Sequence, residues 1–229
     1  MPDFTLQIWA VVLLALAGAI SPAQAGCRDS AAPGVDWENC SKQMLQLQSS
    51  DLTGAKLHNV YLTGTLLTGA KLAEADLSLA ELVRTSFEDA DLSGASFEKA
   101  LAHRASFANA SLNNARLSKA EFVRVIFDGA DLSNADMTKG EFIRNSFRGA
   151  NLEGADLAGS NISRAVFHGA NLTGASFRGT LFHWTRLEYT DLSSVHDLTQ
   201  AQVDSACGDA TTKLPDGLVA PESWPCAPD

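Results

Sequence analysis

The sequence predicts an all-β solenoid, because a five-residue pattern recurs in one unbroken frame through most of the 229 residues. Steps of five from Leu47 to Leu192 give thirty positions, of which seventeen are Leu and ten are Phe. Two residues before each of these, eighteen of the thirty positions are Ala. A period of five fits neither a helix nor a simple strand. Each unit must therefore turn a corner and return one large and one small apolar side chain to a shared core, as stacked solenoid repeats do.

A longer period indicates the number of units in each coil. The segment ELVR at residues 81–84 recurs as EFVR at 121–124 and as EFIR at 141–144. Phenylalanine also recurs every 20 residues, at Phe87, Phe107, Phe127, Phe147 and Phe167. Four pentapeptides therefore close one coil, and about thirty repeats make about 7.5 coils. At a strand spacing of about 4.8 Å, the stack is roughly 36 Å long.

The repeat itself has the form A-(D/N)-(L/F)-x-x, as in ADLSG at residues 90–94 and ADLSN at 130–134. On these motifs, the chain resembles the pentapeptide repeat family over residues 45–194. The resemblance implies a right-handed quadrilateral parallel β-helix. The flanks at 33–37 and 198–208 also resemble the ends of exported bacterial members of that family.

The first 25 residues are typical of a signal peptide. Residues 8–20 form a 13-residue apolar run, which is short for a membrane span of about 20 residues, and Ala23-Gln24-Ala25 offers a cleavage site. The leading MPDFTLQ departs from the pattern because it lacks Lys and Arg. The alternatives are a buried apolar segment, or a lipid attached to Cys27, although Gln24 stands where such a site has Leu. We expect a periplasmic or secreted protein after cleavage near Ala25.

The chain has four cysteines, two on each side of the repeats, namely Cys27, Cys40, Cys207 and Cys226. An even number in an exported protein favours disulfides, with three possible connectivities. The simplest pairs Cys27 with Cys40 and Cys207 with Cys226, so that each bond closes a terminal loop. The spacings match no common zinc pattern.

Both ends of the solenoid carry candidate caps, at residues 26–44 and 195–229. Trp37 is predicted to cover the first coil, where Lys42 occupies a large inward position. At the other end, Thr199 can cap a short helix that runs to about Cys207 and ends at Gly208. Its hydrophobic staple would be Leu198 with Val203.

No catalytic, cofactor or metal-binding constellation is evident, and we expect a protein that is not an enzyme. The five histidines are dispersed, at His58, His103, His168, His183 and His196. Asp and Glu fill outward positions that the repeat supplies in any case. Glycine at the end of a repeat serves turns rather than phosphate binding.

One side of the predicted solenoid carries a distinctive surface, and we regard it as the candidate partner surface. It presents a column of outward side chains, Arg84, Arg104, Arg124, Arg144 and Arg164, followed by Trp184. Beside this column run the outward residues Val83, His103, Val123, Ile143, Ser163 and His183, and Leu101 and Leu181 project from the same side. An apolar stripe flanked by arginines is typical of a contact surface. The alternative is a structural ladder in which Glu81, Glu121 and Glu141 pair with the arginines.

The net charge of −10 raises a second functional class. Some cytoplasmic members of the family bind topoisomerases as acidic mimics of DNA. Residues 41–190, however, contain 16 acidic and 15 basic residues, so most of the negative charge lies at the ends. A rod that competes with DNA should carry charge along its length. We therefore expect a non-catalytic exported scaffold with an unknown protein partner, no nucleic acid and no membrane span. An intracellular mimic that binds a type II topoisomerase is the alternative.

Overall fold

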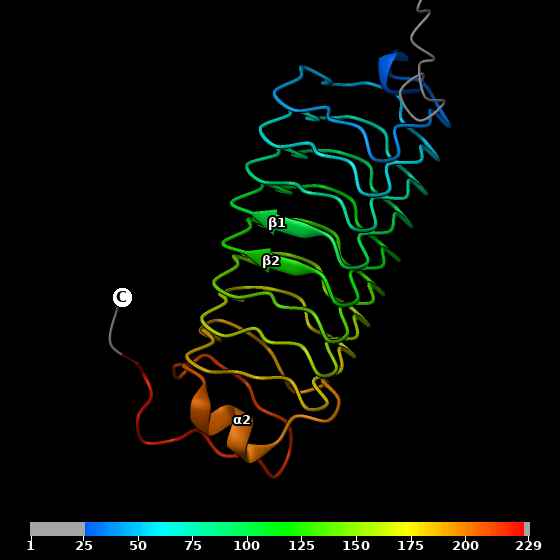
Figure 1. Cartoon of the computed structure of the whole chain (residues 1–229). Helices are drawn as coiled ribbons and strands as arrows, with labels where there is room; N and C mark the ends of the chain where they lie inside the picture. The colour runs from blue at the N-terminus through cyan, green and yellow to red at the C-terminus, as the bar shows by residue number, and fades with distance from the viewer. Residues whose placement is uncertain (1–25, 227–229) are drawn as a thin grey trace, which may run out of the picture.

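The computed structural model describes residues 26–226, which form one continuous stack of coils (Figure 1). Parallel backbone bridges join residues 20 positions apart, from Asp36–Lys56 to Ser176–His196. This register means that four pentapeptides make one coil. The fold is a right-handed quadrilateral parallel β-helix, as the resemblance to the pentapeptide repeat family implies. The predicted signal peptide lies outside the described residues.

Regular strands are short because each side of a coil contributes only a few extended residues before the next turn. Two segments pair over three residues, β1 (Leu101–His103) and β2 (Glu121–Val123), in a parallel two-stranded sheet. Isolated bridges join the other coils with the same 20-residue register, except at the C-terminal end, where Arg186 pairs with Cys207 and Asp191 with Lys213. Backbone hydrogen bonds therefore run along the solenoid axis at every side.

The core contains the two apolar positions of each repeat. From Leu52 to Leu192, every large central residue is buried, and nearly all the small residues two positions earlier are buried as well. Five phenylalanines stack through the middle with ring centroids 4.8–5.1 Å apart, namely Phe87, Phe107, Phe127, Phe147 and Phe167. Identical side chains repeat along the axis because every coil presents the same environment to its neighbours.

The corners of the coils depend on a left-handed backbone at the fifth residue of each repeat. Glycine takes this position often, as at Gly94 and Gly129, where φ is 67° and 69°. For residues with a Cβ this conformation costs roughly 1–2 kcal/mol, and Asn or Asp tolerate it better than most. A bulky residue at this position is thus unfavourable for the backbone.

The N-terminal end is covered by a short 3₁₀ helix, η1 (Gly26–Arg28), and by the segment that follows it. The carbonyl of Asp29 accepts hydrogen bonds from Trp37 Nε1 at 3.2 Å and from Lys42 Nζ at 3.3 Å. The Lys42 ammonium also lies 3.8 Å from the centre of the Trp37 ring. Burial lowers the pKa of Lys42, although the nearby Asp29 carboxylate opposes this effect. These contacts place both side chains over the first coil.

The C-terminal end is closed by helix α2 (Gln200–Ser205). Thr199 caps the helix, and Gln202 completes a reciprocal capping box. The Gln202 amide also donates to the carbonyls of Phe177 and Thr180 at 2.8 and 2.9 Å. The helix thereby satisfies carbonyls at the open end of the solenoid.

The predicted end of this helix was wrong. Helix α2 ends at Ser205, and Ala206 is extended, because the Cys207 amide donates to the Thr185 carbonyl at 2.7 Å and draws the chain onto the last coil. Gly208 therefore does not terminate the helix. A Cβ at Gly208 would lie 2.4 Å from the Trp224 ring, so glycine is needed there for packing.

Candidate interaction surface

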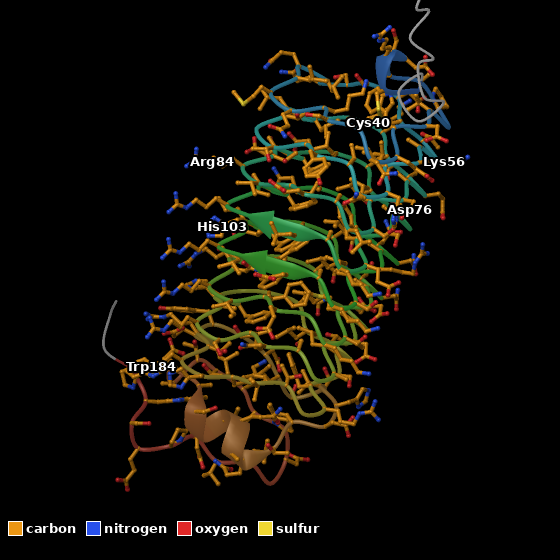
Figure 2. The ribbon with its side chains drawn as sticks, in the orientation of Figure 1. Cys40, Lys56, Asp76, Arg84, His103 and Trp184 are labelled. Atoms are coloured by element: carbon orange, nitrogen blue, oxygen red, sulfur yellow. A yellow bond between two sulfur atoms is a disulfide. The ribbon has the colours of Figure 1, made fainter. Side chains whose placement is uncertain are left out.

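Five arginines occupy equivalent corner positions in five successive coils. We call Arg84, Arg104, Arg124, Arg144 and Arg164 the arginine column. At about 4.8 Å per coil, it extends about 19 Å parallel to the solenoid axis. All five side chains are exposed. Figure 2 shows Arg84 at the same edge of the molecule as His103 and Trp184.

The column residues occupy a backbone conformation that does not favour arginine. Their φ angles lie between 55° and 58°, in the left-handed region. Glycine holds this conformation at Gly94 and Gly129 without a Cβ. Other residues with a Cβ, such as Lys99 and Lys119, hold the same conformation, so the fold does not require arginine at these corners.

The arginines are not neutralised by neighbouring carboxylates. Within residues 26–226, no arginine of the column forms an ion pair, which overturns the alternative of a Glu–Arg ladder. Glu81 accepts a hydrogen bond from Thr63 at 3.2 Å, and Glu141 accepts one from Asn161 at 2.8 Å. Glu81 and Glu141 thus form hydrogen bonds with neighbouring coils. The arginines are exposed to solvent at the corner.

An apolar stripe runs beside the column. Val83, Val123 and Ile143 are half-buried rather than exposed, because the coils above and below lie only about 4.8 Å away and cover part of each side chain. Leu101 and Leu181 project further and are 39% and 60% exposed. The stripe is interrupted by polar residues at His103 and Ser163. The surface thus combines a line of cations with adjacent patches of apolar side chains.

The column ends at Trp184, which occupies the arginine position in the next coil. Its φ is 57° and its side chain is 48% exposed. The Trp184 amide donates to the Ser205 carbonyl at 2.8 Å, which ties this corner to α2. The His183 ring lies beside the indole, with centroids 6.2 Å apart and planes at 77°.

A hollow of about 310 Å³ opens next to Trp184. Its lining comprises His183, Trp184, Asp204, Ser205, Ala206, Cys207, Ser223 and Cys226. The structure joins Cys207 to Cys226, and Cys27 to Cys40. The sequence pattern did not predict the hollow, because the tail that forms one wall returns to the solenoid outside the repeat. The only sequence signal was the pair of cysteines that holds the tail in place.

Two carboxylates outside this surface, Asp51 and Asp209, have structural partners. In residues 26–226, no group of three His, Cys, Asp or Glu side chains is arranged to hold a metal ion. Hydrogen bonds from Thr53 lower the pKa of Asp51, and those from Thr211 lower the pKa of Asp209. Each carboxylate accepts hydrogen bonds from the threonine two positions later in the chain and thereby stabilises a turn. No helix within the same residues is long and apolar enough to cross a bilayer.

The comparisons with known proteins agree with the repeat pattern. Residues 80–157 match a family described as "Pentapeptide repeat region". Residues 46–82, 61–98 and 142–183 match "Pentapeptide repeats (8 copies)". Together these matches cover residues 46–183. A search of curated proteins gave no significant match.

Solved structures of pentapeptide repeat proteins are similar to this chain. HetL, involved in heterocyst differentiation regulation in Nostoc sp. strain PCC 7120, is 24% identical over 86% of this chain and 89% of its own, with a TM-score of 0.30. Full-length QnrB1, a plasmid-mediated fluoroquinolone resistance protein, is 18% identical over 79% of this chain and 91% of its own, with a TM-score of 0.28. A protein from the thylakoid lumen of Arabidopsis thaliana is 32% identical over 44% and 61%, with a TM-score of 0.18.

Proposed function

Because the chain belongs to the pentapeptide repeat family, we propose that it is a non-catalytic exported scaffold that binds an acidic protein partner along the arginine column. The observation that carries this proposal is the line of five exposed arginines without ion pairs. Like charges repeated every coil raise the local positive potential. A complementary partner lowers that repulsion and approaches faster by electrostatic steering.

The chemistry of the guanidinium group supports a role in binding. Arginine is the cation that pairs best with carboxylates, because its guanidinium can donate two parallel hydrogen bonds.

A protein partner is favoured over a nucleic acid by the residues beside the column. Val83, Val123 and Ile143 offer apolar contacts that a phosphate backbone does not use. A protein segment can place carboxylates on the arginines and apolar side chains on the stripe.

The charge distribution also argues against the DNA-mimic alternative. Residues 41–190 are nearly neutral, with 16 acidic and 15 basic residues. Five of those fifteen basic residues form the arginine column, which is a positive line along one side of the rod. A surface that replaces DNA in a topoisomerase would need negative charge in this region.

Export is supported by the covalent structure of the caps. Two disulfides close the terminal segments, and such bonds persist in oxidising compartments. The Cys27–Cys40 bond also uses the sulfur that a lipid thioether at Cys27 would need. We propose a signal peptide at residues 1–25, an N-terminal cap at 26–44, repeats at 45–194 and a C-terminal cap at 195–229.

The proposal is tested by photocrosslinking in the native host, with benzoylphenylalanine at position 124. The matched control places the same group at position 119, because Lys119 occupies the equivalent corner on another side, with φ of 58° against 57°. We expect an adduct with an acidic protein from position 124 alone. The double change Arg104→Glu/Arg144→Glu should abolish it, whereas Lys99→Glu/Lys139→Glu should not. Equal adducts from both positions, or adducts insensitive to the arginine changes, would contradict the proposal.

A further inference from the structure

We infer that the hollow beside Trp184 is an anchor site for one aromatic side chain, at the end of the acidic segment that lies on the arginine column. This inference rests on the proposed function and specifies the partner further. Trp184 continues the column by one coil, and His183 occupies the next position in the row of residues that contains the apolar stripe. The hollow is therefore in line with both features of the surface.

The walls of the hollow are held firmly in place. The Cys207–Cys226 disulfide forms part of its lining. Trp224 packs against Gly208 and donates from Nε1 to the Ala206 carbonyl at 2.8 Å. The backbone amide of Trp184 donates a hydrogen bond to the Ser205 carbonyl. A preformed site loses little entropy when a ligand enters, so contacts made there contribute fully to affinity.

The size and chemistry of the hollow suit an aromatic ring. Its volume is about 310 Å³, and a closed apolar cavity of about 150 Å³ already holds benzene. The Trp184 indole, the His183 imidazole and the two cysteine sulfurs are polarisable groups that pack well on π-systems. Asp204 and Ser223 lie at the same site and supply polar partners for the backbone of a bound peptide.

The geometry also sets the length of the partner segment. Six extended residues span about 20 Å, close to the roughly 19 Å from Arg84 to Arg164. Trp184 lies one coil beyond Arg164, which adds about 4.8 Å along the axis. An aromatic residue within one or two positions of an acidic run can therefore reach the hollow while the carboxylates contact the arginines.

Calorimetric titration with three peptides tests the inference on the full mature chain. The peptides are hexaglutamate, hexaglutamate with Phe at its C-terminus, and hexaglutamate with Phe at its N-terminus. We expect one Phe peptide to bind about tenfold more tightly than hexaglutamate, because its phenyl ring is transferred from water into the hollow. Trp184→Ala should remove that gain without changing the affinity for hexaglutamate.

Tyr189→Ala is the matched control, since Tyr189 is an exposed aromatic residue at the next corner of the same coil, also with φ of 57°. This variant should keep the tenfold gain. If all three peptides bind equally, the anchor site is refuted and the arginine column still stands. If Tyr189→Ala removes the gain as Trp184→Ala does, the hollow is not the anchor. If no peptide binds, the proposed function itself fails.

Discussion

The rings of Phe127 and Phe147 stack with their centroids 5.0 Å apart and their planes only 1° apart. The two residues occupy the same position in successive coils, and both are fully buried. Phe127 also stacks on Phe107 at 5.1 Å, so each ring is held between two others. The centre of the solenoid is therefore a continuous column of aromatic contacts.

Phe127→Ala should lower the free energy of unfolding by about 3–5 kcal/mol, because it leaves a cavity between two rings. Phe127→Leu is the matched control, since leucine fills most of the equivalent positions in the chain, and it should cost clearly less. Urea denaturation followed by circular dichroism measures both. An alanine variant as stable as the parent chain would refute the inward assignment of this position.

Arg124→Asn should leave stability unchanged or raise it, because asparagine tolerates the left-handed backbone better than arginine does. The same change should weaken hexaglutamate binding, since one cation of the column is lost. Lys119→Asn makes the same substitution at the equivalent corner of another side, and it should not affect that binding. Thermal unfolding and calorimetry separate the two effects. A destabilised Arg124→Asn protein would indicate that arginine supports the fold.

Gly208→Ala should destabilise the C-terminal cap, because the new Cβ would meet the Trp224 ring at 2.4 Å. Hydrogen exchange of α2 amides should become faster. In a Trp224→Ala background, Gly208→Ala should lower the free energy of unfolding much less, because the ring that clashes is absent. A double-mutant cycle measures this coupling. Purely additive effects would mean that the contact between the two residues does not limit packing.

The repeat pattern was sufficient to predict a solenoid with four pentapeptides in each coil, and the family resemblance supplied its handedness and cross-section. Each coil repeats the contacts of the previous one, so Phe87 and Phe107 already indicate the 20-residue register that the backbone bridges have. The column could be located for the same reason, since Arg84 and Arg104 share one repeat position.

Features outside the repeat, or dependent on side-chain direction, could not be predicted in the same way. The pairing of Glu81 with Arg84 was a reasonable hypothesis by spacing alone. In the structure, Glu81 instead accepts a hydrogen bond from Thr63, and Arg84 is exposed at the corner. The hollow depends on Gly208 and Trp224, which meet only after the tail folds back.

The pair formed by Asp191 and Lys213 should make the C-terminal cap sensitive to acid. Their side chains lie 2.7 Å apart, and hydrogen bonds from Lys213 and from Ser193 lower the pKa of Asp191 from 3.8 to about 2. The folded state therefore favours the carboxylate, and this stabilisation is present above pH 4 and is lost as the pH falls towards 2. Both groups are largely exposed, so the effect should be small.

Asp191→Asn should thus lower the melting temperature slightly at pH 7 and not at pH 2. Asp131→Asn is the control, because it removes a carboxylate at an equivalent repeat position where Asn151, not lysine, donates to it. Scanning calorimetry between pH 2 and pH 7 compares the variants. A difference between the Asp191→Asn protein and the parent chain that persists unchanged at pH 2 would rule out the ionic explanation.

The intact mass of the protein from its native host should correspond to a chain that begins at Gly26 and has no free thiol. Signal cleavage after Ala25 and the two disulfides both predict this result, because oxidation follows export. Alkylation without reduction should add no mass, whereas alkylation after reduction should label four cysteines. A chain that keeps Met1 and reacts at all four thiols would place the protein in a reducing compartment, and the acidic partner would then have to be sought in the cytoplasm.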